Sequence, residues 1–278
     1  MYKTILVHVD ESPRSAQRTA VAARLALREE AHLVGAAMTG MQTSLLPMGG
    51  YELTFEVAGF SIDDLRAEAN VSLDAFEVAA RQVGVNSIER RCIDEEPGMG
   101  ISLQARYCDL VVISQTDPDQ FLQPLRSGFP DYVLLNAPRP VLVLPLDATP
   151  ATLGQRITVA WNGSAEAVRA IASALPLLQR ARKVNLVVFD ADISGELHGE
   201  VPGADIALYL ARHGVPVEVT SGGAGIDVGA SLLSFAGKNE ADLIVMGAYG
   251  HSRFREILLG GMTRSVLASS TIPLWMSH

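Results

Sequence analysis

The sequence has few of the residues that mark specialised classes of protein. It contains two cysteines, Cys92 and Cys108, in 278 residues, which is too few for a disulfide framework. We expect both to be small, half-buried side chains. No uncharged apolar run is long enough to cross a membrane, and the N-terminal residues lack the apolar stretch of a signal peptide. These absences favour a cytoplasmic protein with no membrane contact.

Basic residues are also scarce. The chain has 22 basic and 31 acidic side chains, a net charge of −9, and its only lysines are Lys3, Lys183 and Lys238. A protein that holds nucleic acid would usually carry a basic surface, so we expect no nucleic-acid partner. The charge is uneven, because residues 1–148 carry a net charge of −8 and residues 149–278 a net charge of −1.

What the sequence does contain is an internal repeat. Residues 109–114 match residues 242–247 at an offset of 133, and this register continues to the pair Pro140 and Pro273. Hydrophobic residues make up 48% of the chain and charged residues 19%, as in globular proteins. The repeat indicates that the chain contains two copies of one kind of domain.

The two copies differ in length. Near their starts, residues 4–13 match residues 157–166, but the offset there is about 152. The first copy must then hold roughly 19 additional residues, which fit best near 40–60. We expect domains at 1–148 and 154–278, joined by the polar, turn-rich linker 147–155.

Each copy alternates short apolar runs with helical patterns. Strands are expected at Thr4–Val9, His32–Ala37, Val85–Arg90, Leu110–Ser114 and Val141–Leu144, and again near 156–161, 184–189, 215–220, 242–246 and 272–276. Ser12 and Pro13 are expected to cap and open the first helix. Ser61 should open another helix that Gly84 ends.

Strands that alternate with helices predict an α/β fold of two tandem, doubly wound, five-stranded parallel-sheet domains that are Rossmann-like. Such sheets bind ligands where the strands end at their carboxyl edge. The turns after the first and fourth strands of each copy therefore matter most for function.

In the second copy, the turn after the fourth strand is rich in glycine. Gly247 and Gly250 follow the strand directly, and Gly260 and Gly261 precede a short helical stretch at 262–269. Glycine lets backbone N–H groups approach an anion closely, and a helix N-terminus adds further donors. Further donors nearby are Thr263, His251, Arg253 and Arg255. These are the parts of a phosphate site, although the same glycines can also serve only to form a loop.

The spacing of Gly247, Gly250 and Gly260 resembles the nucleotide-binding signature of the universal stress protein (Usp) family. The resemblance covers nearly the whole chain as a tandem pair of Usp domains. It implies a fold like the adenine nucleotide alpha hydrolases, with strand order 3-2-1-4-5, and ATP as ligand, with or without Mg²⁺. The binding residues it implies are Ala160, Trp161, Asn162, Phe189, Met246, Gly247, Gly250, His251, Ser252, Arg253, Gly260, Gly261, Met262 and Thr263.

Two positions depart from the family pattern. Gly261 stands where the family has Ser or Thr, and we expect Thr263 to supply the hydroxyl instead. Asn162 replaces the acid at the end of the first strand, so it can accept a hydrogen bond but carries no charge.

The first copy has lost the glycines but keeps the strand-one acid as Asp10. Asp117 and Pro118 stand where the second copy has Gly250 and His251, and a carboxylate there repels phosphate. We therefore expect no ATP in the first copy. Its extra segment carries Met38, Met41, Met48 and Phe55. That segment can cover the cleft, bind a small apolar ligand or simply be a packing loop.

Other catalytic or metal-binding signatures are missing from the sequence. It has no GxxxxGK[ST] phosphate loop and no GxSxG elbow. Residues 221–225 begin like an ATP-pyrophosphatase motif, but they follow the third strand and we read them as a turn. The six histidines show no ligand spacing, so no metal site is predicted. His8 lies inside the first strand and is expected to be a core or cleft residue.

We therefore expect a nucleotide-binding stress-response protein without fast catalysis, in which any ATP hydrolysis is slow. The alternative is a non-nucleotide-binding scaffold that binds a protein partner or a small apolar ligand. An enzyme of the wider nucleotide-binding α/β group is the least favoured reading. The family resemblance also implies an intrachain pseudo-dimer, and a further homodimer stays open.

Overall fold

The structure is a computed structural model that describes residues 1–40, 61–117, 128–146, 152–189, 201–223, 225, 227–250 and 261–278. The chain folds into two compact units. The first unit comprises Met1–Ser114 and Leu122–Arg139, and the second comprises Gln115–Phe121 and Pro140–His278. The predicted domain limits, 1–148 and 154–278, stay a proposal.

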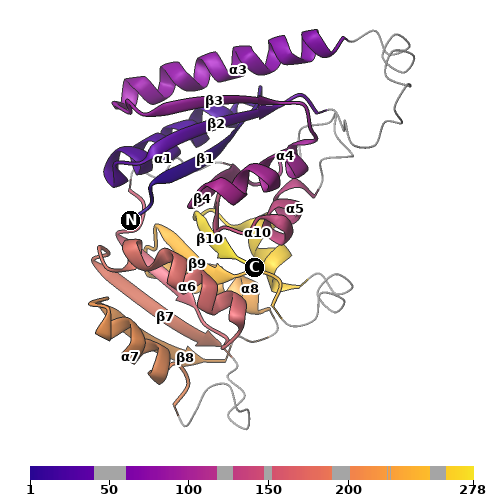
Figure 1. Cartoon of the computed structure of the whole chain (residues 1–278). Coiled ribbons are helices and arrows are strands. Elements are labelled where there is room, and N and C mark those ends of the chain that lie inside the picture. Colours follow the sequence, from indigo (N-terminus) through magenta and orange to yellow (C-terminus); the bar gives the residue numbers. More distant parts are fainter. Residues whose placement is uncertain are drawn as a thin grey trace. The chain divides into compact units, whose positions relative to one another are not determined.

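The first unit is built from four parallel strands with helices packed against them (Figure 1). Its elements are β1 (Thr4–Val9), α1 (Arg14–Glu29), β2 (His32–Met38), α3 (Ile62–Val83), β3 (Ile88–Ile93), α4 (Pro97–Gln104), the 3-10 helix η2 (Ala105–Tyr107), β4 (Leu110–Ser114) and α5 (Phe129–Asn136). The strands lie in the order β3-β2-β1-β4. The β1, β2 and β4 strands are apolar and nearly fully buried, as expected for a sheet that is covered on both faces.

The second unit repeats this plan. Its elements are β5 (Val141–Leu144), β6 (Arg156–Ala160), α6 (Ala165–Leu178), β7 (Lys183–Phe189), α7 (Ala204–Arg212), β8 (Val217–Gly222), α8 (Val228–Lys238), β9 (Leu243–Gly247), α10 (Met262–Ser269) and β10 (Leu274–Ser277). The strands lie in the order β5-β10-β9-β6-β7-β8. All neighbours are parallel except β5 and β10, which pair antiparallel with Leu274 opposite Val143.

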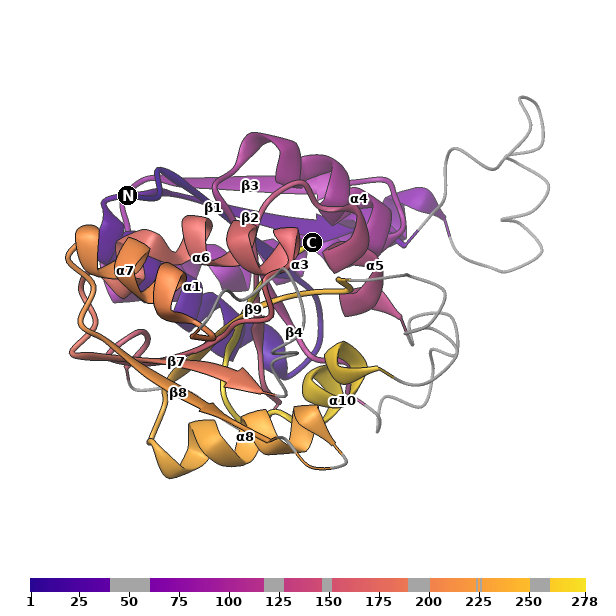
Figure 2. The same cartoon turned by 90° about the horizontal axis from the view of Figure 1, so that it is seen from below.

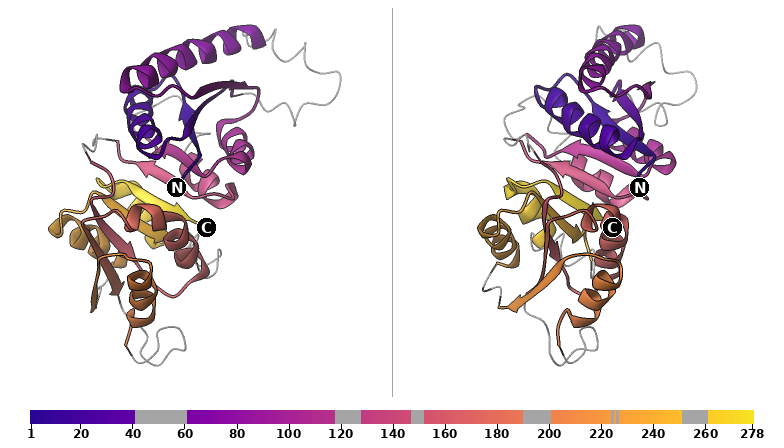
Figure 3. Two further views of the ribbon diagram at one scale, coloured as in Figure 1. Left: turned by 60° about the vertical axis from the view of Figure 1, so that its left-hand side comes forward. Right: turned by 90° about the vertical axis from the view of Figure 1, so that its left-hand side faces the viewer.

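The predicted strand order 3-2-1-4-5 is confirmed, because the second copy runs β8-β7-β6-β9-β10. Helices α6 and α7 lie on one face of these strands, and α8 and α10 lie on the other (Figures 2 and 3). This is the arrangement that right-handed crossovers produce in a doubly wound sheet.

Most element boundaries follow their sequence signals. Ser61 caps α3 through a reciprocal pair of hydrogen bonds with Asp64, and Gly84 ends that helix in the left-handed conformation. The third strand starts three residues later than predicted, at Ile88, because residues 85–87 form the connection after α3. The prediction that Ser12 caps α1 was wrong: its hydroxyl donates to Asp10 Oδ1 instead, at 2.6 Å.

The two thiols lie in different environments. Cys108 is buried, and this burial raises its pKa to about 12, so the thiolate is scarce at neutral pH. Cys92 is exposed on β3 rather than half-buried as predicted. Among the described residues, no helix combines the length and apolar character needed to cross a membrane. The same residues contain no group of three or more His, Cys, Asp or Glu side chains placed to hold a metal ion.

Candidate functional site

The second unit brings the predicted residues that the structure describes to one edge of its sheet. Because β6 is parallel to both β7 and β9, the carboxyl ends of these strands share that edge. The residues at this edge are Ala160, Trp161 and Asn162 after β6, Phe189 at the end of β7, Met246, Gly247 and Gly250 around the end of β9, and Gly261, Met262 and Thr263 where α10 begins. His251, Ser252, Arg253 and Gly260 lie outside the described residues, and so do residues 41–60 of the first copy. Met38, which precedes that segment, ends β2.

Asn162 shapes the turn that leads into α6. Its side-chain oxygen Oδ1 accepts a hydrogen bond from the backbone N–H of Ser164 at 3.1 Å. The Ser164 hydroxyl in turn accepts from the N–H of Ala167 at 3.2 Å and caps the helix. The Asn162 side chain is exposed, so its position is fixed by this turn while it faces the solvent side of the sheet edge.

Gly247 and Gly250 are glycines because the start of α6 packs against them. A Cβ atom on Gly247 would lie 2.7 Å from the backbone nitrogen of Ala167 and 2.8 Å from Cβ of Glu166. A Cβ atom on Gly250 would lie 2.9 Å from Oε2 of Glu166. The close approach of α6 therefore explains Gly247 without a ligand. The requirement is weaker at Gly250, because the nearest atom there is the end of the flexible Glu166 side chain. Both glycines are partly exposed.

Replacing Gly247 with alanine is expected to destabilise the protein by about 1–3 kcal/mol. The new methyl group would meet backbone atoms of α6, which cannot rotate out of its way. Urea unfolding of the variant measures this loss. The matched control is Gly237→Ala, since Gly237 has open space around its Cβ position, and equal stabilities for the two variants would contradict the packing account.

The glycine turn and the start of α10 are held together by one hydrogen bond. Tyr249 has a positive φ of 56°, and its backbone N–H donates to Oγ1 of Thr263 at 3.2 Å. Thr263 is 3% exposed. Its hydroxyl thus fixes the turn against the helix, and it keeps its own proton for donation. Gly261 precedes α10 with no side-chain cap on the helix N-terminus.

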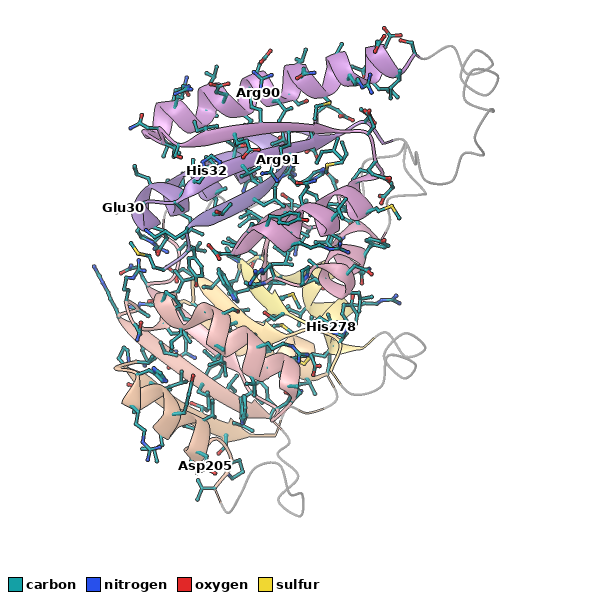
Figure 4. All side chains as sticks on the ribbon, viewed as in Figure 1. Glu30, His32, Arg90, Arg91, Asp205 and His278 are labelled. Carbon is teal, nitrogen blue, oxygen red and sulfur yellow. The ribbon has the colours of Figure 1, made fainter. Side chains whose placement is uncertain are left out.

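Glu166 and Arg169 form the charged wall of the site. The Glu166 carboxylate is 18% exposed and bonds to Arg169 through Oε1 at 2.6 Å. Burial opposes ionisation of this carboxyl, but its own backbone N–H and the charge of Arg169 outweigh burial and lower its pKa. Arg169 also donates to the main-chain oxygen of His278 at 3.0 Å, and Figure 4 labels His278 just beyond the end of β10. None of Glu166, Arg169 and His278 was predicted from the sequence as a site residue.

Apolar side chains complete the edge. Ala160, Trp161, Phe189 and Met262 are partly exposed there, whereas Met246 is buried at 3% exposure. The Phe189 ring meets the ring of Phe235 edge to face, with centroids 6.4 Å apart. Partly exposed aromatic rings beside backbone donors suit a planar, polar ligand such as a nucleobase.

Both halves of the chain match one protein-family model. The Universal stress protein family model matches residues 1–145 and again residues 154–278. The chain belongs to the universal stress protein family. It carries two Usp domains in tandem, as the repeat predicted.

Solved structures show the same fold. A universal stress protein from Archaeoglobus fulgidus DSM 4304 aligns with a TM-score of 0.70 and 18% identity, over 98% of this chain and 94% of the other. A protein from Pseudomonas aeruginosa UCBPP-PA14 aligns with a TM-score of 0.62 and 16% identity, over 99% and 92% of the two chains. None of the curated proteins matches the sequence significantly.

The first unit has the same turn as the second at the end of its first strand. Oδ1 of Asp10 accepts from the backbone N–H of Ser12 at 3.2 Å, as Oδ1 of Asn162 accepts from Ser164. Both partners are two residues downstream, so the structure supports the offset of 152 between these positions.

Unlike Asn162, Asp10 also forms an ion pair with a buried arginine. Arg18 of α1 is 2% exposed, and its guanidinium donates to Oδ1 of Asp10 at 2.8 Å, to the Ser114 hydroxyl at 3.0 Å and to the main-chain oxygen of His8. Burial opposes the charge on Asp10, but the charge of Arg18, together with His8 and the Ser12 hydroxyl, outweighs burial and holds the pKa of this carboxyl far below its usual value. When the two copies are aligned at the offset of 152, Ala170 of the second unit corresponds to Arg18 of the first.

His8 belongs to the same cluster. It is 6% exposed, its Nδ1 lies 3.6 Å from Oδ2 of Asp10, and its ring packs on Phe129 with centroids 4.8 Å apart. This agrees with the expectation of a core or cleft histidine. The first Usp domain therefore fills the strand-one end of its own site with protein side chains.

Proposed function

We propose that the second Usp domain binds an adenine nucleotide, with ATP as the ligand, and that the protein acts in stress signalling rather than in fast catalysis. The observation that carries this proposal is the Tyr249–Thr263 hydrogen bond, which joins the glycine turn to the uncapped start of α10 at the carboxyl edge of a Usp sheet. Backbone N–H groups in such a place bind phosphate.

The proposed contacts follow from the layout of the edge. The base would lie against Trp161 and Phe189, and the ribose beside Asn162. The phosphates would meet the backbone of Gly247 and Gly250 and the start of α10, with His251, Ser252, Arg253 and Gly260 from the intervening segment. Ala160, Met246, Gly261 and Met262 would complete the shell, and Mg²⁺ can accompany the phosphates.

We propose one nucleotide per chain. In the first domain, Asp10 is paired with Arg18, and Asp117 replaces the glycine that corresponds to Gly250. Arg18 is buried and each of its three nitrogens donates to a protein oxygen, so it is poorly placed to bind a phosphate, and the added carboxylate repels one.

A scaffold that binds a protein partner is the second candidate function. It is favoured by an apolar stripe on the first unit, formed by Met99, Leu103 and Tyr107, which are 37%, 41% and 70% exposed. Aligning Gly98 of α4 with Gly229 of α8 puts Ala230, Ser234 and Lys238 at the corresponding positions of the second unit. One copy is thus apolar where the other is small or polar.

Mass spectrometry of the supernatant after denaturing the purified protein tests the first proposal against the second. We expect a co-purified adenine nucleotide, and a rise in melting temperature when ATP and Mg²⁺ are added. Absence of both would leave the scaffold as the better account.

We also propose a cytoplasmic location, where thiols such as Cys92 and Cys108 remain free.

A further inference from the structure

We propose that Glu166 is a specificity-determining residue, whose carboxylate makes the second domain favour adenine nucleotides with few negative charges over those with a long phosphate chain. This inference rests on the proposed nucleotide site. ATP still binds to this site, but repulsion from the carboxylate makes it bind less tightly than an adenine nucleotide with fewer negative charges.

Glu166 comes from a different element than the glycine turn, yet it lies directly against it. A Cβ atom on Gly250 would be 2.9 Å from its Oε2, and a Cβ atom on Gly247 would be 2.8 Å from its Cβ. Only 18% of the side chain is exposed. Any phosphate that uses the backbone of this turn would therefore approach a partly desolvated negative charge, which is screened less than one on the open surface.

The carboxylate is held in this place by its neighbours. Arg169 binds Oε1 at 2.6 Å, which leaves Oε2 as the oxygen nearest Gly250. Arg169 is anchored on the main-chain oxygen of His278, and Nδ1 of His278 lies 3.0 Å from the main-chain oxygen of Ala248 in the turn itself. These contacts lead back to the turn, so moving the carboxylate away would cost the hydrogen bond with Arg169.

The charge state supports the same reading. The lowered pKa of Glu166 keeps it ionised at neutral pH. The side chain of its partner Arg169 is 50% exposed, so solvent screens this charge and it offsets the carboxylate only in part. When the two copies are aligned at the offset of 152, Arg14 of the first unit corresponds to Glu166. The fold therefore does not require an acidic residue at this position.

The test compares adenosine, AMP and ATP by titration calorimetry on the full chain, at fixed ionic strength and without divalent metal. Glu166→Gln keeps the size of the side chain and an oxygen for Arg169. We expect it to raise the affinity for ATP about tenfold and for AMP about threefold, and to leave adenosine unchanged. Arg169→Gln should act in the opposite direction and weaken ATP most.

Glu218→Gln is the matched control, because Glu218 is an exposed acid of β8 that pairs with Lys183. It should change none of the three affinities, and all variants are checked by thermal melting. If Glu166→Gln shifts adenosine, AMP and ATP by the same factor, the specificity role is wrong while the nucleotide site stands. If the wild-type chain binds none of the three, the proposed function fails and takes this inference with it.

Discussion

Replacing Gly250 with aspartate is expected to lower the affinity of the second domain for ATP by about 30-fold or more. The new side chain would start 2.9 Å from Oε2 of Glu166 and 3.3 Å from the Ser164 hydroxyl. Two carboxylates would then face the place proposed for phosphate, and the turn itself would shift. The first copy already has aspartate at this position, as Asp117.

Two further variants at the same position separate size from charge. Gly250→Ala adds only a methyl group that meets the movable end of Glu166, and Gly250→Asn has the size of aspartate without its charge. We expect the loss of affinity to increase from alanine to asparagine to aspartate, measured by calorimetry with melting temperatures as the check on folding. Unchanged ATP affinity in Gly250→Asp would mean that nucleotide, if bound, uses a different loop.

Replacing Arg18 with alanine is expected to destabilise the protein by about 3–5 kcal/mol. The change would leave the Asp10 carboxylate, which is 19% exposed, without its cation, and it would remove the donors to Ser114 and to the main-chain oxygen of His8. Urea unfolding followed by circular dichroism measures the loss. Arg156→Ala is the control, because Arg156 is 48% exposed and its partner Glu240 is 75% exposed, so its removal should leave stability nearly unchanged.

The same ion pair predicts a pH dependence. The pKa of Asp10 is depressed in the folded protein, so its contribution is fully present above the unfolded value of 3.8 and is lost as pH falls below that value toward the folded pKa. The difference in unfolding free energy between wild type and Asp10→Asn should therefore be largest at neutral pH and shrink in acid. A difference that stays constant from pH 7 to pH 3 would show that the pair is not ionic.

Much of the fold could be predicted because its signals are local. The register between residues 109–114 and 242–247 revealed the duplication, and the apolar β-branched runs marked the buried strands. The capping box at Ser61 and the glycine at Gly84 set the ends of α3 correctly. The start of β3 was misplaced because the strand was begun at the apolar Val85, whereas Asn86 and Ser87 still belong to the connection and the pairing with β2 begins at Ile88.

The candidate site could be predicted only in part, for a physical reason. Asn162, Gly247 and Thr263 each follow or precede an apolar element, so topology alone places them at one edge. Glu166 is an ordinary residue in the first turn of a helix, and nothing in its neighbourhood signals that α6 brings it against Gly250. Arg18 likewise reads as a helix-surface charge until the fold buries it beside Asp10.

The unequal charge of the two copies has a structural counterpart. The more acidic copy is the one whose strand-one acid is paired internally with Arg18, and the near-neutral copy keeps the glycine turn, with the Glu166 carboxylate beside it. This difference supports the proposal that the second domain, and not the first, binds the nucleotide.

The stoichiometry of adenine-nucleotide binding to the full wild-type chain tests this account most directly. Calorimetric titration with ATP and Mg²⁺ is expected to give one nucleotide per chain. Two nucleotides per chain, or none, would contradict the assignment of an available second domain and a closed first one.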